Sequence, residues 1–496
     1  MAGEQHWDCL VIGAGISGLD VAYHLQEHCP WASYAIIERR ANLGGTWDFF
    51  KYPGIRSDSD MYTFGFSWKI WKSATPIATG EEILAYLHEA AEEQGIKDKI
   101  KFGMDVSSAS WSSEDNRWHL EMSSGELVSC GMLFGCTGYY SYEQPHEPAF
   151  PGQARFPGPV VHPQKWTEEC DKAIVGKKVA IIGSGATAVT ILPNISDSAA
   201  HVTMVQRTPT YIAAKPGIDP IAQFFNNWLP SGVAVKINRW KAVLLGALFY
   251  QYCTRYPGHA KKLIRGGMFA QVKKVMSQEE FDRHFTPPYN PWEQRFCLAP
   301  DGDFFAPIRE GKATMVTGHI DTFTETGIKM KGGEEVEADF IIAATGLRLQ
   351  KNFPFSTMKV SIDGKEYKAN EHMLYNGIMI DDVPNFGFVM GYTNASWTLK
   401  ADISAIYFTK LLSYMRTNKV AKVMPLEDPK DNVVREATTG GLTSGYFARA
   451  ADIMPKSGDK VPWRGGLNYL ADLLRLSLGG LTTDSLQFTN NEKKDK

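Results

Sequence analysis

The sequence has no apolar run long enough to cross a membrane. Its longest run, residues 242–250, has nine residues, whereas a bilayer-spanning helix needs about 20. We predict that this run forms a buried helix, and contact with a membrane surface is the alternative. The first apolar strand begins at Cys9, too near the N-terminus to leave room for a signal peptide, so we expect a cytoplasmic protein.

The sequence also lacks a surplus of one charge and a close pair of cysteines. The formal net charge is −3, and acidic and basic residues are spread along the chain, which argues against a nucleic-acid partner. The seven cysteines are widely spaced and form no CxxC pair, so we expect reduced thiols, no disulfide relay and no metal site. These absences favour small-molecule chemistry, and they carry no signal for an oligomeric state.

Two glycine-rich turns are present, each between an apolar strand and a helix. In DCLVIGAGISGL, Gly13 permits the turn, Gly15 lets the backbone approach a pyrophosphate, and Gly18 lets the helix pack closely on the strand. The same design returns in KKVAIIGSGATAV with three small residues, Gly183, Gly185 and Ala188. In each case the helix N-terminus would face the anion. The chain therefore contains two predicted dinucleotide-binding units.

The residue at the end of the following strand distinguishes the two units. Glu38 lies 25 residues after Gly13, where a carboxylate binds the ribose diol of a cofactor without a 2'-phosphate. Arg207 lies 24 residues after Gly183, where an arginine accepts a 2'-phosphate, and Thr208 beside it adds a further donor. We therefore predict FAD in the first unit and NADPH in the second.

The predicted fold class is α/β, with two Rossmann-like dinucleotide-binding domains and a helical insertion. Short glycine turns at Gly138 and Gly346 each follow an apolar strand, and the second marks a return to the first domain. We predict that the FAD-binding domain has a first part at residues 1–145 and a second part at residues 346–496. The NADPH-binding domain has a first part at residues 146–209 and a second part at residues 289–345. The helical insertion comprises residues 210–288.

Between the two predicted domains lies a pattern that resembles a known family. Phe156, Gly158, His162 and Trp166 form an FxGxxxHxxxW arrangement, which is similar to the fingerprint of flavin-containing and Baeyer-Villiger monooxygenases. The tryptophan resembles the Baeyer-Villiger branch, although Thr167 stands where many members of that branch have proline. A histidine in a Pro/Gly-rich linker more often forms a structural hydrogen bond than donates a proton in catalysis. We therefore expect His162 to couple the two domains.

A second Baeyer-Villiger pattern lies in GGTWDFFKYPGIRSD, which spans residues 44–58. The segment looks too irregular for a helix or a strand, and we predict a loop that turns at Pro53 and Gly54. We expect the rings of Trp47 and Tyr52 to line the binding sites of the flavin and the nicotinamide. The stretch fits the pattern [AG]GxWxxxx[FY]P[GM]xxxD at every constrained position, which are Gly44, Gly45, Trp47, Tyr52, Pro53, Gly54 and Asp58.

The resemblance, which extends over nearly the whole chain, implies a reaction. NADPH would reduce FAD, and the reduced flavin would capture O2 as a C4a-peroxyflavin. A deprotonated peroxide would convert a ketone to an ester or lactone. The alternative is a flavin-containing monooxygenase that oxidises sulfur or nitrogen centres, and sulfoxidation can accompany ketone oxidation. The predicted partners are thus O2 and a small ketone, or a sulfide.

The resemblance also implies catalytic residues. Arg295 stands where the family places the arginine that stabilises the peroxide anion, a task that suits a side chain that never loses its proton. Gln294 precedes it where many relatives have lysine. Asp58 matches the family's active-site aspartate and is the predicted counter-ion of Arg295, in place of the nearer Arg56. Asp60 is equally acidic, and only the resemblance favours Asp58 over it.

Overall fold

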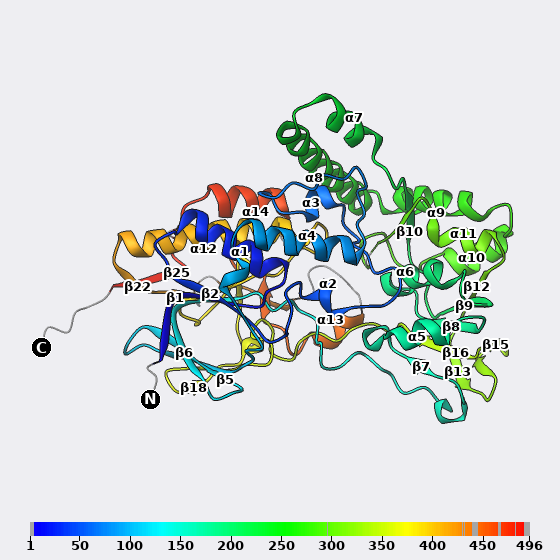
Figure 1. The fold of residues 1–496 in the computed structure, drawn as a ribbon, viewed down its shortest axis with the longest axis horizontal. Helices are drawn as coiled ribbons and strands as arrows, with labels where there is room; N and C mark the ends of the chain where they lie inside the picture. The colour runs from blue at the N-terminus through cyan, green and yellow to red at the C-terminus, as the bar shows by residue number, and fades with distance from the viewer. Residues whose placement is uncertain are drawn as a thin grey trace, which may run out of the picture.

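The protein is described from a computed structural model, whose long axis runs through two β-sheets (Figure 1). The first sheet and the helices above it form the left half in that view, and the second sheet lies in the right half. The structure describes residues 4–294, 296–428, 430, 432–438, 445–464, 468–481 and 483–490.

The first sheet is mixed, with parallel strands on one side. Among the described residues its order is β18 (Lys365–Glu366), β17 (Lys359–Ile362), β4 (Val106–Ser112), β5 (Arg117–Met122), β6 (Leu127–Gly135), β1 (Gln5–Ile12), β2 (Tyr34–Glu38) and β3 (Ile100–Phe102), with β21 (Phe386–Phe388) also beside β6. Strands β6, β1, β2 and β3 run parallel, whereas β5 is antiparallel to β4 and to β6. The expected parallel arrangement around β1 is therefore present.

The second sheet is parallel throughout its described strands. Its order is β12 (Ala313–Thr317), β9 (His201–Gln206), β8 (Lys178–Ile182), β16 (Phe340–Ala343) and β7 (Val160–Val161). After β16 the chain returns to the first sheet through β17, β18 and β21. The two-sheet α/β fold predicted from the glycine turns is confirmed.

Three helices cover one face of the first sheet, as Figure 1 shows. They are α1 (Ile16–His28), α4 (Gly80–Glu93) and α12 (Trp397–Thr417). Residues of β1 alternate between two cores, because successive side chains of a strand point to opposite faces. Val11 is buried in the core with α1 and α12, and Leu10 in the core on the other face.

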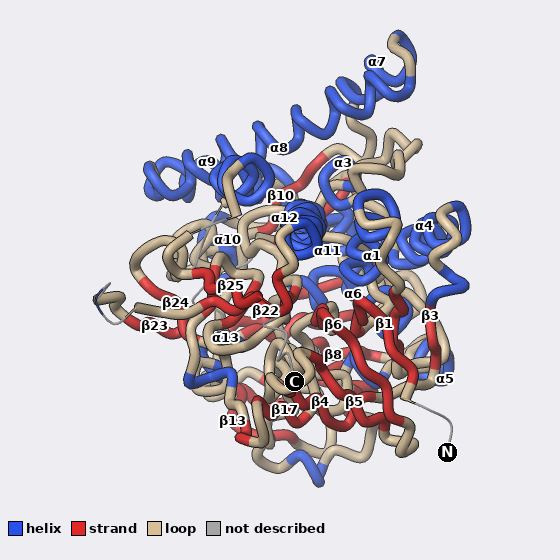
Figure 2. The backbone as a smooth tube through the Cα atoms, turned by 90° about the vertical axis from the view of Figure 1, so that its left-hand side faces the viewer, coloured by secondary structure: helices blue, strands red, loops and turns tan. Residues whose placement is uncertain are grey.

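A helical arm packs on the second half at one end and projects from the body at the other. We use this name for residues 220–276, which contain α7 (Pro220–Trp228), α8 (Ser231–Arg255) and α9 (Pro257–Val272). Figure 2 shows α8 leading away from the body, with α7 at its far end. The helix α10 (Gln278–Phe285) follows the arm, and the short strand β10 (Ile212–Lys215) precedes it.

Two expectations about local structure need correction. Residues 242–250 are helical as predicted but are not buried, because Leu244, Leu245 and Leu248 are exposed and only Val243 is buried. The segment 44–58 is not wholly a loop, since Thr46–Phe49 forms one helical turn, α2. Within the described residues, no helix is both long and apolar enough to span a membrane.

Candidate functional site

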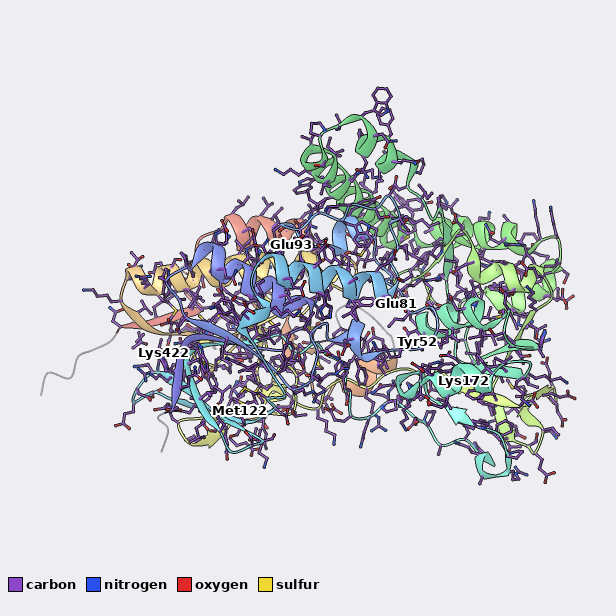
Figure 3. The ribbon with its side chains drawn as sticks, viewed as in Figure 1. Tyr52, Glu81, Glu93, Met122, Lys172 and Lys422 are labelled. Atoms are coloured by element: carbon purple, nitrogen blue, oxygen red, sulfur yellow. The ribbon has the colours of Figure 1, made fainter. Side chains whose placement is uncertain are left out.

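A cavity of about 970 Å³ lies between the two halves of the molecule. Gly13, Glu38 and Trp47 line it from the first half, and Thr187 lines it from the second. Tyr52, labelled in Figure 3, lies where the two halves meet. The cavity therefore borders the first glycine turn and reaches the second unit.

The first glycine turn has the backbone geometry that the sequence predicts. Gly13 has φ of +105°, and a Cβ atom there would lie 2.6 Å from the carbonyl oxygen of Cys136. At Gly18 a Cβ atom would lie 1.9 Å from the Gly13 carbonyl oxygen, so helix and turn touch directly. Gly15 is the N-cap of α1 and provides no side-chain cap. The first amide groups of α1 thus remain available for an anion.

Glu38 ends β2 beside this turn. Its Oε2 accepts a hydrogen bond from the Ala14 amide at 2.8 Å, and its Oε1 accepts one from the Arg40 amide at 2.9 Å. Each carboxylate oxygen can accept a second hydrogen bond. Because Glu38 also lines the cavity, its remaining acceptor sites suit the two hydroxyl groups of a ribose.

The second glycine turn repeats this geometry. Gly183 has φ of +130°, and a Cβ atom there would lie 2.3 Å from the Ala344 carbonyl oxygen. Gly185 is the N-cap of α6 (Ala186–Ile195), again without a side-chain cap, and a Cβ atom at Gly185 would meet nothing within 4 Å. Ala188 is fully buried. This helix end therefore also leaves room for an anion.

Arg207 and Thr208 follow β9 beside the second turn. Ser184 donates a hydrogen bond from Oγ to the Thr208 carbonyl oxygen at 2.6 Å, which ties the two loops together. Arg207 is exposed, and no ion pair is recorded for it within the described residues. Neither residue lines the cavity.

The segment 44–58 crosses from one half of the molecule to the other. Trp47 packs against the core under α1 and contacts Phe64 edge to face, with ring centroids 5.6 Å apart. Tyr52 packs instead against the core of the second half. Burial, reinforced by the negative charge of Asp58, raises the pKa of Tyr52, so its phenol stays protonated. The two predicted aromatic walls thus belong to opposite sides of the cavity.

The charged residues at the end of this segment and just beyond it differ in their contacts. Asp60 is the N-cap of α3 (Met61–Phe64) and accepts a hydrogen bond from the Thr63 amide at 3.1 Å. Asp58 and Asp60 are both half-buried and both line the cavity. Arg56 forms an ion pair with Asp303. These contacts give Asp60 and Arg56 structural partners of their own.

Arg295, the predicted partner of Asp58, lies outside the described residues. Trp292 and Phe296, which are described, line the cavity. The pairing of Asp58 with Arg295 stays a prediction.

The linker residues lie outside the cavity and have structural contacts. The Gln164 amide donates to His162 Nδ1 at 3.1 Å, so Nε2 carries the proton and donates to the Gly346 carbonyl oxygen at 3.0 Å. Burial lowers the pKa of His162, which keeps the ring neutral. Trp166 donates to Asp171 at 3.0 Å. Phe156 is buried. Gly158 packs closely against the backbone, because a Cβ atom there would lie 2.3 Å from the Asp339 carbonyl oxygen.

Several cavity residues are absent from the sequence predictions. The arm contributes a stretch of α8, residues 241–251, for which helical spacing alone indicated core packing. Trp397 lines the cavity and stacks on Tyr139, with ring centroids 5.2 Å apart. Tyr142 stacks on Phe49 at 4.0 Å. The aromatic residues after Gly138 could have been predicted to line the cavity, because they directly follow a glycine turn that ends an apolar strand.

Comparisons with known proteins agree with this geometry. The sequence profile of the Pyridine nucleotide-disulphide oxidoreductase family matches residues 10–223, which include both glycine turns. The FAD-containing monooxygenase EthA of Mycolicibacterium smegmatis is 46% identical over 491 residues, which cover 98% of each chain. The chain belongs to the family of FAD-containing monooxygenases. The predicted family resemblance and the predicted enzyme class, a flavin monooxygenase, are thereby confirmed.

Two further proteins place this monooxygenase among its relatives. The probable FAD-binding monooxygenase AlmA of an Acinetobacter species is 44% identical over 490 residues, covering 98% of this chain and 97% of that one. A solved structure described as oxidized steroid monooxygenase bound to NADP superimposes with a TM-score of 0.76 at 21% identity, covering 98% of this chain and 100% of that chain. The similarity to the steroid monooxygenase structure supports the assignment of the fold.

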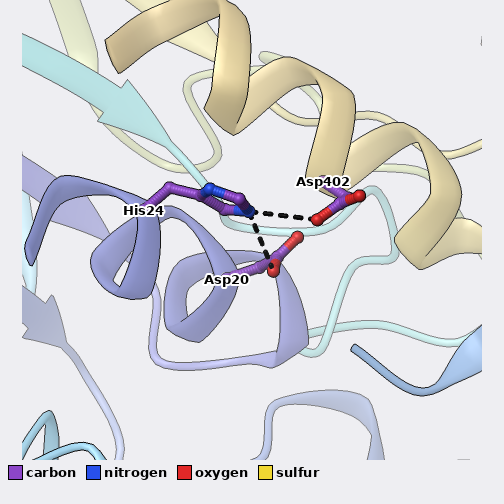
Figure 4. A group of neighbouring side chains, drawn as sticks. All are labelled: Asp20, His24 and Asp402. Atoms are coloured by element: carbon purple, nitrogen blue, oxygen red, sulfur yellow. Dashed lines mark hydrogen bonds and ion pairs between the residues drawn. The ribbon is translucent and has the colours of Figure 1, made fainter. Parts of the chain in front are cut away.

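The monooxygenase also contains a buried ionisable cluster between α1 and α12, drawn in Figure 4. His24 Nε2 lies 3.0 Å from Asp402 Oδ1 and 3.9 Å from Asp20 Oδ1. Trp68 donates to Asp20 at 2.9 Å. These contacts connect the first nucleotide-binding helix to the helix that begins at the cavity wall.

The protonation of this cluster follows from its burial. Burial, with the nearby charge of Asp402, raises the pKa of Asp20 to about 7. Burial alone would lower the pKa of His24, but its hydrogen bond to Asp402 and the charge of Asp20 outweigh burial and raise it. Burial opposes ionisation of Asp402 as well, yet the hydrogen bond from His24 lowers its pKa. Below pH 7 the cluster therefore holds one ion pair and a neutral Asp20.

This arrangement predicts a pH-dependent stability effect of Asp20→Asn. A carboxyl with a raised pKa stabilises the fold at low pH and loses that contribution as the pH rises through its folded pKa. The loss begins above the unfolded pKa of about 4 and is complete above pH 7. We therefore expect the melting temperature of the variant, relative to that of the wild type, to be about 2 to 4 °C higher near pH 8 than near pH 5. Thermal unfolding at several pH values measures this difference.

The matched control is Asp402→Asn, which should lower the melting temperature throughout this range because it removes the partner of His24. Parallel melting curves of Asp20→Asn and wild type across the pH range would contradict the assignment.

Proposed function

We propose that this chain is an FAD- and NADPH-dependent Baeyer-Villiger monooxygenase, which uses O2 to convert ketones to esters or lactones. The observation that carries the proposal is the placement of the segment 44–58. Its Trp47, Tyr52 and Asp58 all line the cavity that also contains the first glycine turn. The fold shared with the steroid monooxygenase supports the proposal.

The residues around the first turn fit FAD. Uncapped amide groups at the start of α1 suit its pyrophosphate, and Glu38 has acceptor sites for its ribose. Gly45 lies beside Gly15, so that a Cβ atom at Gly15 would lie 3.6 Å from the Gly45 Cα atom. When bound, FAD supplies the redox chemistry with O2.

The second turn fits NADPH in the same way. The start of α6 is uncapped at Gly185, and exposed Arg207 beside it can form paired, charge-assisted hydrogen bonds with a 2'-phosphate. Thr208 lies next to Arg207 and can add a hydroxyl donor. Thr187, in the first turn of α6, faces the cavity and links this pocket to the reaction site.

Within the cavity, the chain's own residues would control charge and water. Arg295 would hold a fixed positive charge near the reacting oxygen, and Asp58 would orient its guanidinium. Trp47 and Tyr52 would exclude water from opposite sides. His162 takes no part in proton transfer, because both ring nitrogens are already engaged.

The second candidate function is oxidation of sulfur or nitrogen centres. The departure from the Baeyer-Villiger linker at Thr167 favours it, since this residue, just before the helix α5 (Glu168–Ala173), stands where many members of the branch have proline. We propose a cytoplasmic location for either activity.

Product analysis separates the two candidates. Aerobic incubation with NADPH and a panel of linear, cyclic and aryl ketones plus one sulfide should yield ester or lactone from at least one ketone. Omission of NADPH is the control, because it should abolish every product. Sulfoxide without any ester or lactone would favour the second candidate and refute ketone oxidation.

Replacement of Arg295 should separate flavin reduction from oxygenation. In Arg295→Ala we expect anaerobic reduction of FAD by NADPH to remain measurable, while product formation falls by about 100-fold or more because a fixed charge is lost. Stopped-flow absorbance measures the first and product yield the second. Arg295→Lys keeps a positive charge and should recover part of the yield, and full ester formation by Arg295→Ala would disprove the role.

Replacement of Arg207 should remove the preference for NADPH. In Arg207→Ala we expect kcat/KM for NADPH to fall by about 10- to 100-fold, since charge-assisted hydrogen bonds to the 2'-phosphate are lost. The value for NADH should change by less than about twofold, because NADH has no 2'-phosphate. Initial rates with both cofactors measure this, and an unchanged preference for NADPH would exclude the assignment.

A further inference from the structure

We propose that the helical arm docks on an anionic lipid bilayer and that the cavity receives an apolar, long-chain substrate from that bilayer. The docking stands on the surface of the arm alone. The delivery of substrate rests on the proposed function.

The far end of the arm carries exposed apolar side chains on one helix face. Ile221, Phe224 and Trp228 are spaced three and four residues apart along α7, so they lie on the same side of the helix. Their exposed fractions are 52%, 56% and 75%. Water-exposed aromatic and aliphatic side chains grouped in this way favour an interface with lipid.

The long helix α8 continues this surface. Val233, Trp240, Leu244 and Leu248 are exposed, and their spacing of seven, four and four residues places them along one stripe of the helix. Lys236 lies three residues after Val233 and is also exposed on that side. Lys236 therefore lies at the edge of an exposed apolar stripe, where its ammonium group can reach anionic headgroups.

The charge of the arm identifies the kind of bilayer. Residues 220–276 contain nine lysine and arginine residues and no aspartate or glutamate, although the whole chain has a net charge of −3. Several have partners, such as Lys241, which pairs with Asp219 at 2.6 Å. Five are exposed and have no recorded ion pair among the described residues, namely Lys236, Arg255, Lys262, Lys273 and Lys274. This excess of exposed positive charge on the arm is complementary to anionic headgroups.

The exposed surface of α8 is continuous with the cavity. Leu244, Leu245 and Leu248 line the cavity, yet their exposed fractions are 48%, 57% and 66%. They therefore form an apolar rim at its opening. A substrate dissolved in lipid could pass this rim without crossing water, so the chemistry favours a ketone or sulfide with a long hydrocarbon chain.

A second copy of the chain fits this surface less well. In a symmetric dimer each arm would meet the same patch on its partner, so unpaired positive charges would face positive charges. The exposed Trp228 and Trp240 instead match the preference of tryptophan for the boundary between lipid and water.

Vesicle flotation with the FAD-loaded enzyme tests the docking. We expect binding to vesicles of phosphatidylcholine with about 30 mol% phosphatidylglycerol to be at least about tenfold tighter than binding to pure phosphatidylcholine. Salt of about 0.5 M should weaken the binding. Equal binding to both vesicle types, or no binding to either, would overturn the proposal.

Two sets of variants assign the binding to the arm. Phe224→Ser with Trp228→Ser removes apolar contacts, and Lys236→Glu, Lys262→Glu and Lys274→Glu together reverse charge. Each set should reduce binding by about tenfold. The matched controls change equally exposed residues elsewhere and should bind like the wild type. They are Leu127→Ser with Val175→Ser, and Lys99→Glu, Lys101→Glu and Lys172→Glu.

Sedimentation of the same proteins tests the alternative occupant. A dimer that dissociates in the Phe224→Ser, Trp228→Ser variant, together with absence of vesicle binding by the wild type, would assign the surface to a second copy and overturn the proposal. Circular dichroism should show equal helix content in all variants, because every changed side chain is exposed.

Turnover tests the delivery of substrate separately. With a short ketone dissolved in buffer, the arm variants should consume NADPH at the wild-type rate. With a ketone of about sixteen carbons carried in anionic vesicles, they should be slower by about fivefold or more. Equal rates with the vesicle-borne ketone would disprove delivery. If the wild type floats with vesicles but oxidises neither ketone, the proposed function fails and the docking stands.

Discussion

The guanidinium of Arg56 joins the two halves of the molecule. It forms an ion pair with Asp303 and donates to the Leu298 carbonyl oxygen at 3.2 Å, and only 10% of its side chain is exposed. Leu298 lies in β11 (Cys297–Pro300) of the second half, whereas Arg56 belongs to the segment that leaves the first. Loss of one partner would leave a nearly buried charge without compensation. Arg56 also lines the cavity, so this contact lies at its wall.

The rest of the site follows from this anchor. Because Arg56 holds the end of the crossing segment, Trp47 stays on the core of the first half while Tyr52 reaches the core of the second. Asp60, two residues beyond Asp58, caps α3 and fixes the direction of the chain. Asp58 is thereby held at the cavity wall between two anchored neighbours. His162 adds a second connection through the Gly346 carbonyl oxygen.

The limits of sequence interpretation are clearest on the arm. The apolar run at residues 242–250 indicated a buried helix, and helix formation was predicted correctly because it depends on local spacing. Burial was predicted wrongly, since it depends on whether another element covers the helix. Leu248 is exposed at the opening of the cavity, while Cys253, five residues further along α8, is buried in the core of the second half. The partner of Arg56 was likewise hidden, because Asp303 is 247 residues away along the chain.

The sequence by itself determined the two glycine turns, the α/β fold and the family. Gly13 and Gly183 require positive φ and close contact with a neighbouring strand, and such backbone requirements restrict which residues can stand there. Only the tertiary structure decided that Arg56 connects the halves and that the leucines of α8 form a rim. Those roles depend on which distant atoms meet, and residue type and spacing carry no information about such encounters.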